Sequence, residues 1–250
     1  MRILSNIKSY FYSGLSGLIL PIPKYLFPAP FENASRLTYY ASHFNSIEIN
    51  SSFYKIPQGA TVSKWASSVP EDFKFTFKLW REITHVPGLN FKAADVDHFF
   101  KVIDNVQHKK GCLLVQFPPG LKIGSISHLK KLLICLKEYN TSGWKIAVEF
   151  RNKSWNDDSI YQLLNDFKAC LVIQDKLATP SISHEQDFIY IRFHGPTGNY
   201  RESYSDDFLS EYATYIHEWI SEGKEVYVYF NNTMGDAFGN LKALNALVRD

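Results

Sequence analysis

Ionisable residues recur at the ends of short segments in which apolar and polar residues alternate. Glu48 stands in Ser-Ile-Glu-Ile-Asn, Glu149 in Ala-Val-Glu-Phe-Arg, and Arg192 in Tyr-Ile-Arg-Phe-His. Two carboxylates can serve as general acid and general base where unequal neighbours separate their pKa values. Arginine can hold a phosphate or a carboxylate through two parallel hydrogen bonds. These residue types therefore predict a site for a small anionic or polyhydroxylated molecule.

The candidate site comprises two groups of residues. The residues that could transfer protons are Glu48, Glu149, Asp175 and His194. The cations, amides, imidazole and tyrosines that could bind a substrate are Asn50, Tyr54, Lys78, His85, Gln116, Arg151, Arg192, Tyr200 and Asn231. Carboxylates and imidazoles together also suit one divalent metal ion, so a single bound Zn²⁺, Mn²⁺ or Mg²⁺ is an open alternative. The same charges could instead be internal ion pairs that only stabilise the fold.

The elements that would position these residues follow from the periodicity of the sequence. Runs with strand periodicity are Ser9–Ser13, Ser46–Asn50, Phe73–Lys78, Cys112–Phe117, Lys145–Phe150, Cys170–Gln174, Ile189–His194 and Glu225–Asn231. Helices are expected at Glu32–His43, Ala60–Ser68, Ala93–His108, Ile126–Tyr139, Asn156–Phe167, Asp206–Ser221 and Asp236–Val248. The segment Lys176–Phe188 is too short and too rich in serine for a full helix, and an irregular loop is expected there.

This alternation predicts an α/β protein with a single domain over residues 1–250, a (β/α)8 TIM barrel. An open, doubly wound sheet is the alternative. Successive side chains of a strand face opposite sides, and six of the strands carry one apolar face and one face that ends in polar residues. In a barrel the apolar face packs on the helices, and the polar residues converge at the carboxyl ends of the strands. That is the end where barrel enzymes place their chemistry.

Composition and motifs exclude several classes of protein. The 27 Lys and Arg residues nearly balance the 25 Asp and Glu residues, so nucleic acid would need a local basic patch. Three cysteines cannot form a disulfide framework, which fits a reducing compartment. The apolar stretch 14–20 is short and is followed by Pro21 and Pro23, so we expect neither a signal peptide nor a membrane span. A cytoplasmic location is therefore expected. Glycine-rich nucleotide motifs, serine-hydrolase elbows and zinc-protease motifs are missing, so no nucleotide cofactor is expected.

Several motifs together resemble the YecE-like family, the domain-of-unknown-function family 72. They are Tyr39–Tyr54, Thr61–Trp65, Phe73–Lys78 with Ile83–His85, Leu114–Pro119, Ala147–Arg151 with Ser154 and Trp155, Tyr190–Gly195, and Val226–Asn232. The resemblance covers nearly the whole chain and implies a TIM barrel, but it brings no established reaction.

The chain departs from the family pattern at two places. Leu15 stands within a segment where the family usually has Gly-Thr-Ser-Gly or Gly-Cys-Ser-Gly, Leu18 replaces the aromatic residue that follows that motif, and Asn152 stands where the family tends to have histidine. Both changes remove polar or titratable groups from the expected site.

Three functional hypotheses follow from the sequence. The first is an enzyme that acts on a sugar or phosphate ester, with Glu48 and Glu149 as proton-transfer groups or metal ligands and with Lys78, Arg151 and Arg192 orienting the anion. The second is a non-catalytic protein that binds a metabolite in the same pocket. The third is nucleic-acid processing, by analogy with endonuclease-IV-like barrels. The expected partner is a small molecule. Nucleic acid is a less favoured partner, and no interaction with a membrane is expected.

Overall fold

The computed structural model describes residues 10–175 and 186–249, and in these parts parallel strands alternate with helices. The strands are β1 (Phe11–Leu15), β2 (Ser46–Ile49), β3 (Lys74–Lys78), β4 (Lys110–Gln116), β5 (Lys145–Glu149), β6 (Ala169–Leu171), β7 (Ile173–Gln174), β8 (Phe188–Phe193) and β9 (Glu225–Phe230). The helices are α2 (Arg36–Ala41), α3 (Gly59–Ser67), α4 (Arg81–Thr84), α5 (Ala93–Ile103), α6 (Ile126–Tyr139), α7 (Asp158–Asp166), α8 (Asp206–Ser221) and α9 (Ala237–Arg249).

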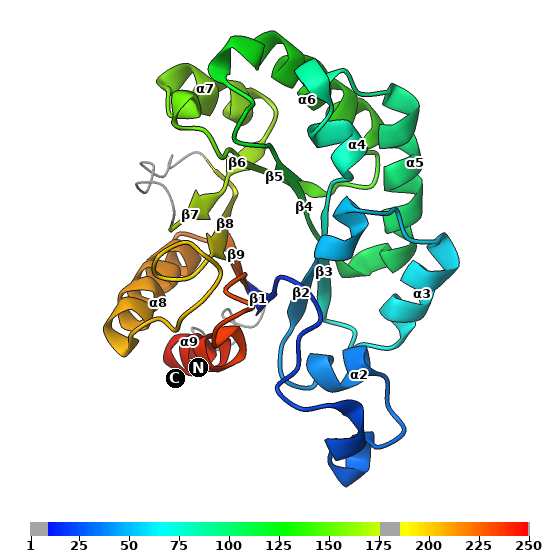
Figure 1. Cartoon of the computed structure of the whole chain (residues 1–250), viewed down its shortest axis with the longest axis vertical. Coiled ribbons are helices and arrows are strands. Elements are labelled where there is room, and N and C mark those ends of the chain that lie inside the picture. Colours follow the sequence, from blue (N-terminus) through cyan, green and yellow to red (C-terminus); the bar gives the residue numbers. More distant parts are fainter. Residues whose placement is uncertain (1–9, 176–185, 250) are drawn as a thin grey trace.

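The strands form two parallel sheets. One has the order β2-β3-β4-β5-β6 and the other β1-β9-β8-β7. Figure 1 shows the strands in the middle of the molecule, with α8 and α9 beside the second sheet and α3 to α7 beside the first. A single bridge between Ser16 and Glu48 links β1 to β2. At the other junction, β6 pairs with β5 and β7 pairs with β8, and only Val172 separates β6 from β7 along the chain.

Each strand places its apolar residues on the face covered by helices, as the alternation predicts. The outer faces carry Ile47, Phe75, Val115, Val148, Ile191 and Val228, which belong to one buried cluster with helix residues such as Phe99, Leu132 and Ile216. The inner faces carry a second buried cluster that includes Leu114, Ala147, Tyr190, Tyr227 and Tyr229. The predicted division of the strands into two faces is therefore confirmed.

Hydrogen bonds between inner-face side chains join the two sheets. The Tyr229 hydroxyl, on β9, lies 2.6 Å from Ser46 Oγ on β2 and 2.7 Å from Thr76 Oγ1 on β3. A buried hydroxyl without such partners would cost desolvation energy. The inner faces of the two sheets therefore face one another and are joined by specific polar contacts.

Most element boundaries differ from the prediction by one or two residues, and the differences at four elements are as follows. The predicted strand Cys170–Gln174 is two strands, because the chain changes its partner from β5 to β8 within it. The first strand is Phe11–Leu15 rather than Ser9–Ser13, in register with β9. Helix α2 begins at Arg36 because the Ser35 side chain caps it, accepting from Thr38 N. Helix α5 ends at Ile103, and the following turn, 104–109, is a 3₁₀ helix.

Residues 176–185, most of the predicted irregular segment Lys176–Phe188, lie outside the described residues, and Phe188 begins β8. None of the helices in the described parts of the chain has the length and apolar character that crossing a bilayer requires.

Gly14 gives a direct test of the junction between β1 and β2. A Cβ atom at this position would overlap the backbone carbonyl of Ser46. We expect Gly14→Ala to lower the free energy of unfolding by about 1–3 kcal/mol, since overpacking forces the two strands apart. Urea denaturation measures the change. Gly124→Ala is the matched control, because its Cβ would meet nothing within 4 Å. Equal stability of the two variants would contradict close packing at this junction.

Candidate functional site

The centre of the site is the Arg192 guanidinium, on the inner face of β8. Its Nε and Nη2 donate to Glu48 Oε2 and Oε1 at 3.0 and 2.8 Å, and its Nη1 donates to Glu149 Oε2 at 2.6 Å. All three residues are at most 1% exposed. Glu48 Oε2 also accepts from the Tyr190 hydroxyl at 2.5 Å. One arginine thus joins carboxylates from β2 and β5, and both oxygens of Glu48 are engaged.

Glu149 lies between two arginines. Burial by itself would raise the pKa of Glu149, but the positive charges of Arg192 and Arg151 outweigh it and lower that pKa to about 2. Arg151 Nε lies 2.5 Å from Glu149 Oε1, close enough for an ion pair but without the alignment of a hydrogen bond. Glu149 is therefore an ionised carboxylate at neutral pH, and one of its oxygens lacks an aligned donor among the described residues.

His194 follows β8 and is completely buried. Its Nε2 faces Arg151 Nη2 at 2.9 Å and Arg192 Nη1 at 3.4 Å, while its Nδ1 lies 3.0 Å from Asp175 Oδ1. Guanidinium groups only donate, so we assign Nε2 as the acceptor and place the proton on Nδ1. Burial, with the two arginines, lowers the pKa of His194 against the opposing hydrogen bond to Asp175. The imidazole is therefore neutral at pH 7.

The Asp175 carboxylate accepts further hydrogen bonds in addition to its contact with the His194 ring. Its Oδ2 accepts from the backbone N–H of His194 at 2.8 Å and from the Tyr204 hydroxyl. The same hydroxyl accepts from Gly195 N at 2.6 Å. Burial and the Asp175 carboxylate raise the pKa of Tyr204, so this hydroxyl stays protonated. Asp175 thus orients the His194 ring and fixes its tautomer.

Lys78 ends β3 on the same inner face. Its Nζ lies 4.1 Å from the centre of the Phe53 ring, and no carboxylate among the described residues lies within ion-pair distance of it. Burial and the Arg192 charge lower the pKa of Lys78 to about 8, although Glu149 and Glu48 oppose this shift. The nearby His85 ring packs edge-on against Phe53, and burial with the Lys78 charge lowers the pKa of His85 to about 4.

The remaining predicted residues lie around this network or apart from it. Gln116 is paired in register with Glu149 and therefore shares its face. Asn50 donates to Ser16 O at 3.2 Å, and the Tyr200 ring stands edge-on to His194. Asn231 donates its backbone N–H to Phe193 O at 2.7 Å. Tyr54 is 69% exposed, and the structure does not bring it into the network.

The network contains residues outside the predicted set of catalytic and substrate-binding residues. Tyr190, Gln174, Tyr204 and Phe53 all contact it or share its face. Tyr190 and Gln174 have the same strand parity as Arg192, which is a signal the sequence does carry. Tyr204 lies in a loop ten residues after His194, and nothing local marks it.

Buried polar atoms without hydrogen-bond partners gather at this end of the strands. Among the described residues they include Ser16 Oγ, Asn50 Oδ1, Glu149 Oε1 and Gln174 Oε1. Ser16 bridges to Glu48, and Gln174 is in register with Arg192, so these two side chains share the face of the charged residues. Burying a polar atom without a hydrogen-bond partner costs folding free energy, so each of these atoms needs an explanation.

The donor set does not fit the divalent-metal alternative. Within residues 10–175 and 186–249, no three His, Cys, Asp or Glu side chains are grouped as a metal ion would need. Glu48 and Glu149 are directed at Arg192 instead.

The two departures from the family pattern have structural roles. The Leu15 side chain is fully buried in the cluster that faces the helices. Asn152 accepts from Ser154 N at 3.0 Å and donates to Pro119 O at 2.8 Å, so it ties the loop after β5 to the loop after β4.

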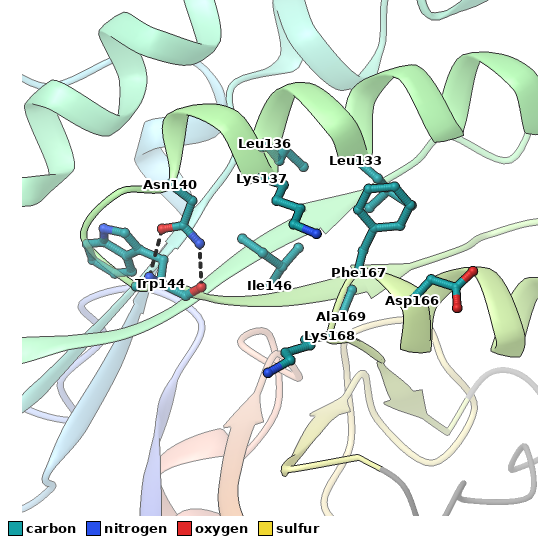
Figure 2. A pocket seen from close by; sticks show the side chains of 11 residues that line it. Leu133, Leu136, Lys137, Asn140, Trp144, Ile146, Asp166, Phe167, Lys168 and Ala169 are labelled. Atoms are coloured by element: carbon teal, nitrogen blue, oxygen red, sulfur yellow. Dashed lines mark hydrogen bonds between the residues drawn. The ribbon is translucent and has the colours of Figure 1, made fainter.

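A separate cavity of about 280 Å³ lies at the opposite end of β5. Its wall includes Leu133, Leu136, Ile146 and Phe167, and Figure 2 shows Lys137 and Lys168 beside it. Asn140 forms two hydrogen bonds with the backbone of Trp144 at its edge, drawn as dashed lines in Figure 2. Ile146 is near the start of β5, whereas Glu149 ends it, so this cavity is distinct from the charged network.

The fold and the buried charges define a parallel α/β protein with a polar centre at the carboxyl ends of its strands. The family model described as "Protein of unknown function DUF72" matches residues 19–250, and the chain belongs to this family. The UPF0759 protein YunF of Bacillus subtilis is 28% identical over 89% of this chain and 90% of its own length. The UPF0759 protein YecE of Escherichia coli K12 is 30% identical, over 32% of this chain and 29% of its own length.

Solved structures of the same family share the fold. A DUF72 family protein of Thermotoga maritima has a TM-score of 0.80 and 26% identity, and the match covers 96% of this chain and all of that one. A DUF72 family protein of Enterococcus faecalis has a TM-score of 0.77 and 21% identity, and covers 96% of each chain.

Glu149→Gln tests the energetics of the network. Removing this charge leaves two buried arginines with less compensation, so we expect a loss of about 3–5 kcal/mol at pH 7 in urea unfolding. The pKa of Glu149 is lower in the folded state than its ordinary value of 4.5. The stability that it contributes is therefore complete above pH 4.5 and is lost as pH falls towards 2.

The pH dependence separates this effect from a simple loss of packing. The wild-type unfolding free energy should fall more steeply than that of E149Q between pH 4.5 and 2. Asp97→Asn removes only a surface ion pair to Lys101 and should cost about 0–1 kcal/mol. Parallel pH profiles for wild type and E149Q would contradict the ionised state of Glu149.

Proposed function

We propose that this protein is an enzyme that acts on a small anionic, hydroxyl-bearing molecule bound at the carboxyl ends of the strands. The observation that carries the proposal is the presence of buried polar atoms without hydrogen-bond partners in the described structure, among them Asn50 Oδ1 and Gln174 Oε1, at the strand ends that also carry Lys78 and Arg151. Buried polar atoms in stable structures are as a rule satisfied, so these atoms support a bound molecule as their partner. A sugar phosphate is the substrate class that meets both the charge and the hydrogen-bonding requirement.

We further propose that the two sheets are parts of one closed (β/α)8 barrel in a single domain. The Ser16–Glu48 bridge supports closure at one junction, and the continuous segment Ala169–Gln174 supports it at the other. Side-chain contacts between the inner faces, such as Glu48 with Arg192, support it as well. In such a barrel the network would lie at the end where catalytic residues are found.

The anion would be held by Arg151 and Lys78. Arg151 uses Nε towards Glu149 and Nη2 towards His194, and its Nη1 has no partner among the described residues. Its side chain is 12% exposed, so a solute can reach it, unlike Arg192 at 1%. Lys78 adds a second cation that no carboxylate neutralises by direct contact in the described parts of the chain.

The unpartnered atoms indicate the rest of the ligand. Asn50 Oδ1 and Gln174 Oε1 are hydrogen-bond acceptors, so the ligand must bring donors to them. Hydroxyl groups are such donors. Glu48 and Glu149 both hold Arg192 in position, and Glu149, which also pairs with the accessible Arg151, is the carboxylate that would accept a proton.

Ligand-induced thermal stabilisation tests the binding proposal. Ribose 5-phosphate and glucose 6-phosphate should raise the Tm of the wild-type protein more than inorganic phosphate or glucose does, since each supplies both anion and hydroxyls. Arg151→Gln should remove most of this gain. Arg36→Gln, an exposed arginine on α2, should keep it. Equal gains in the two variants would contradict an anion site at Arg151.

Turnover is a separate measurement. Each stabilising compound is incubated with the protein and followed by ¹H and ³¹P NMR. New resonances are expected with wild type and should be lost with E149Q, because the proton acceptor is gone. Binding without conversion of any such compound would instead identify a metabolite-binding protein.

A further inference from the structure

Lys78 differs in its contacts from Lys109, which is buried. Lys109 Nζ donates to the carbonyl oxygens of Ala66 and Val69, both at 2.9 Å, and pairs with Glu71 at 3.0 Å. Lys78 Nζ forms no hydrogen bond or ion pair among the described residues, and it lies over the Phe53 ring, 4.1 Å from the ring centre. All three hydrogens of Lys109 are therefore engaged, whereas the nitrogen of Lys78 is available to a bound molecule.

The groups that face Lys78 come from four elements. They are Arg192 on β8, Glu149 and Arg151 at the end of β5, Glu48 on β2, and the neutral His85 after α4. Both carboxylates are already bound to Arg192, so they neutralise Arg192 first. An amine next to a fixed cation and away from water loses its proton more easily and becomes a nucleophile. The Arg151 side chain is 12% exposed and its charge also acts on Lys78, so we assign the charged end of the same molecule to it.

We propose that Lys78 is a carbonyl-reactive residue that forms a Schiff base with an aldehyde or ketone group of the anionic substrate. This inference rests on the proposed function, because it places the substrate carbonyl at Lys78 and its anionic group at Arg151. It adds the class of reaction, carbon–nitrogen bond formation at a carbonyl, to the class of ligand.

The step balances without an oxidant or a reductant. The lone pair of Lys78 Nζ forms a bond to the carbonyl carbon, and the carbonyl π electrons move to its oxygen. A proton passes from the nitrogen to that oxygen and gives a carbinolamine. The carbinolamine takes one proton from solvent, loses its hydroxyl as water and becomes the protonated imine. The amine, the carbonyl compound and one proton thus give the iminium ion and one water.

Reductive trapping of the wild-type protein tests the proposal. Dihydroxyacetone phosphate or pyruvate is added with sodium cyanoborohydride at pH 8, and the modified lysines are mapped by peptide mass spectrometry. A group whose pKa falls from 10.5 to about 8 has on the order of 100-fold more neutral amine at neutral pH. We therefore expect trapping at Lys78 to be at least about tenfold faster than at any exposed lysine.

Two variants and a second carbonyl compound distinguish failure of the Schiff-base inference from failure of the proposed anion site. Lys78→Arg should abolish the fast adduct, and Lys109→Arg should leave it unchanged. Stabilisation by sugar phosphates with no preference for Lys78 in trapping would overturn the Schiff-base inference and leave the proposed function intact. Equally fast trapping of neutral acetone and of pyruvate at Lys78 would support the reactive amine and overturn the anion site.

Discussion

The pairing of Arg192 with Glu48 and Glu149 constrains the rest of the inner face. Moving three charges out of water costs several kcal/mol for each ion, and only well-aligned partners repay that cost. The guanidinium meets this requirement by using Nε and Nη2 for one carboxylate and Nη1 for the other. Because the three residues come from β8, β2 and β5, the pairing holds strands of both sheets at defined positions.

The polar centre changes in character from its interior to its rim. In the interior, Glu48 has every oxygen paired, and Tyr190 supplies a further hydrogen bond. Towards the rim, Arg151 keeps one nitrogen free in the described structure, and Lys78 contacts an aromatic ring instead of a carboxylate. The buried ions thus set the electrostatic environment, while Arg151 and Lys78 are the proposed contacts that a solute can reach.

Membership of the DUF72 family supports the fold of this chain but not its chemistry. Structures at 21–26% identity share the arrangement of strands and helices, and one fold can serve many reactions. The functional argument therefore depends on this chain's own residues. Leu15 packs towards the helices, and Asn152 joins two loops, so neither departure from the family pattern removes a member of the Arg192 network.

The sequence by itself determined the alternation of strands and helices and the face on which each strand residue lies, because both depend on a local period of two or 3.6 residues. It therefore identified Glu48, Glu149, Arg192 and Lys78 as residues of one face. Only the tertiary structure decided which carboxylate meets which arginine, that Tyr204 reaches Asp175 from a later loop, and that Tyr54 stays outside. It also decided that Cys170–Gln174 changes partners between two sheets. Those contacts depend on the register between strands far apart in the chain, and no local pattern specifies that register.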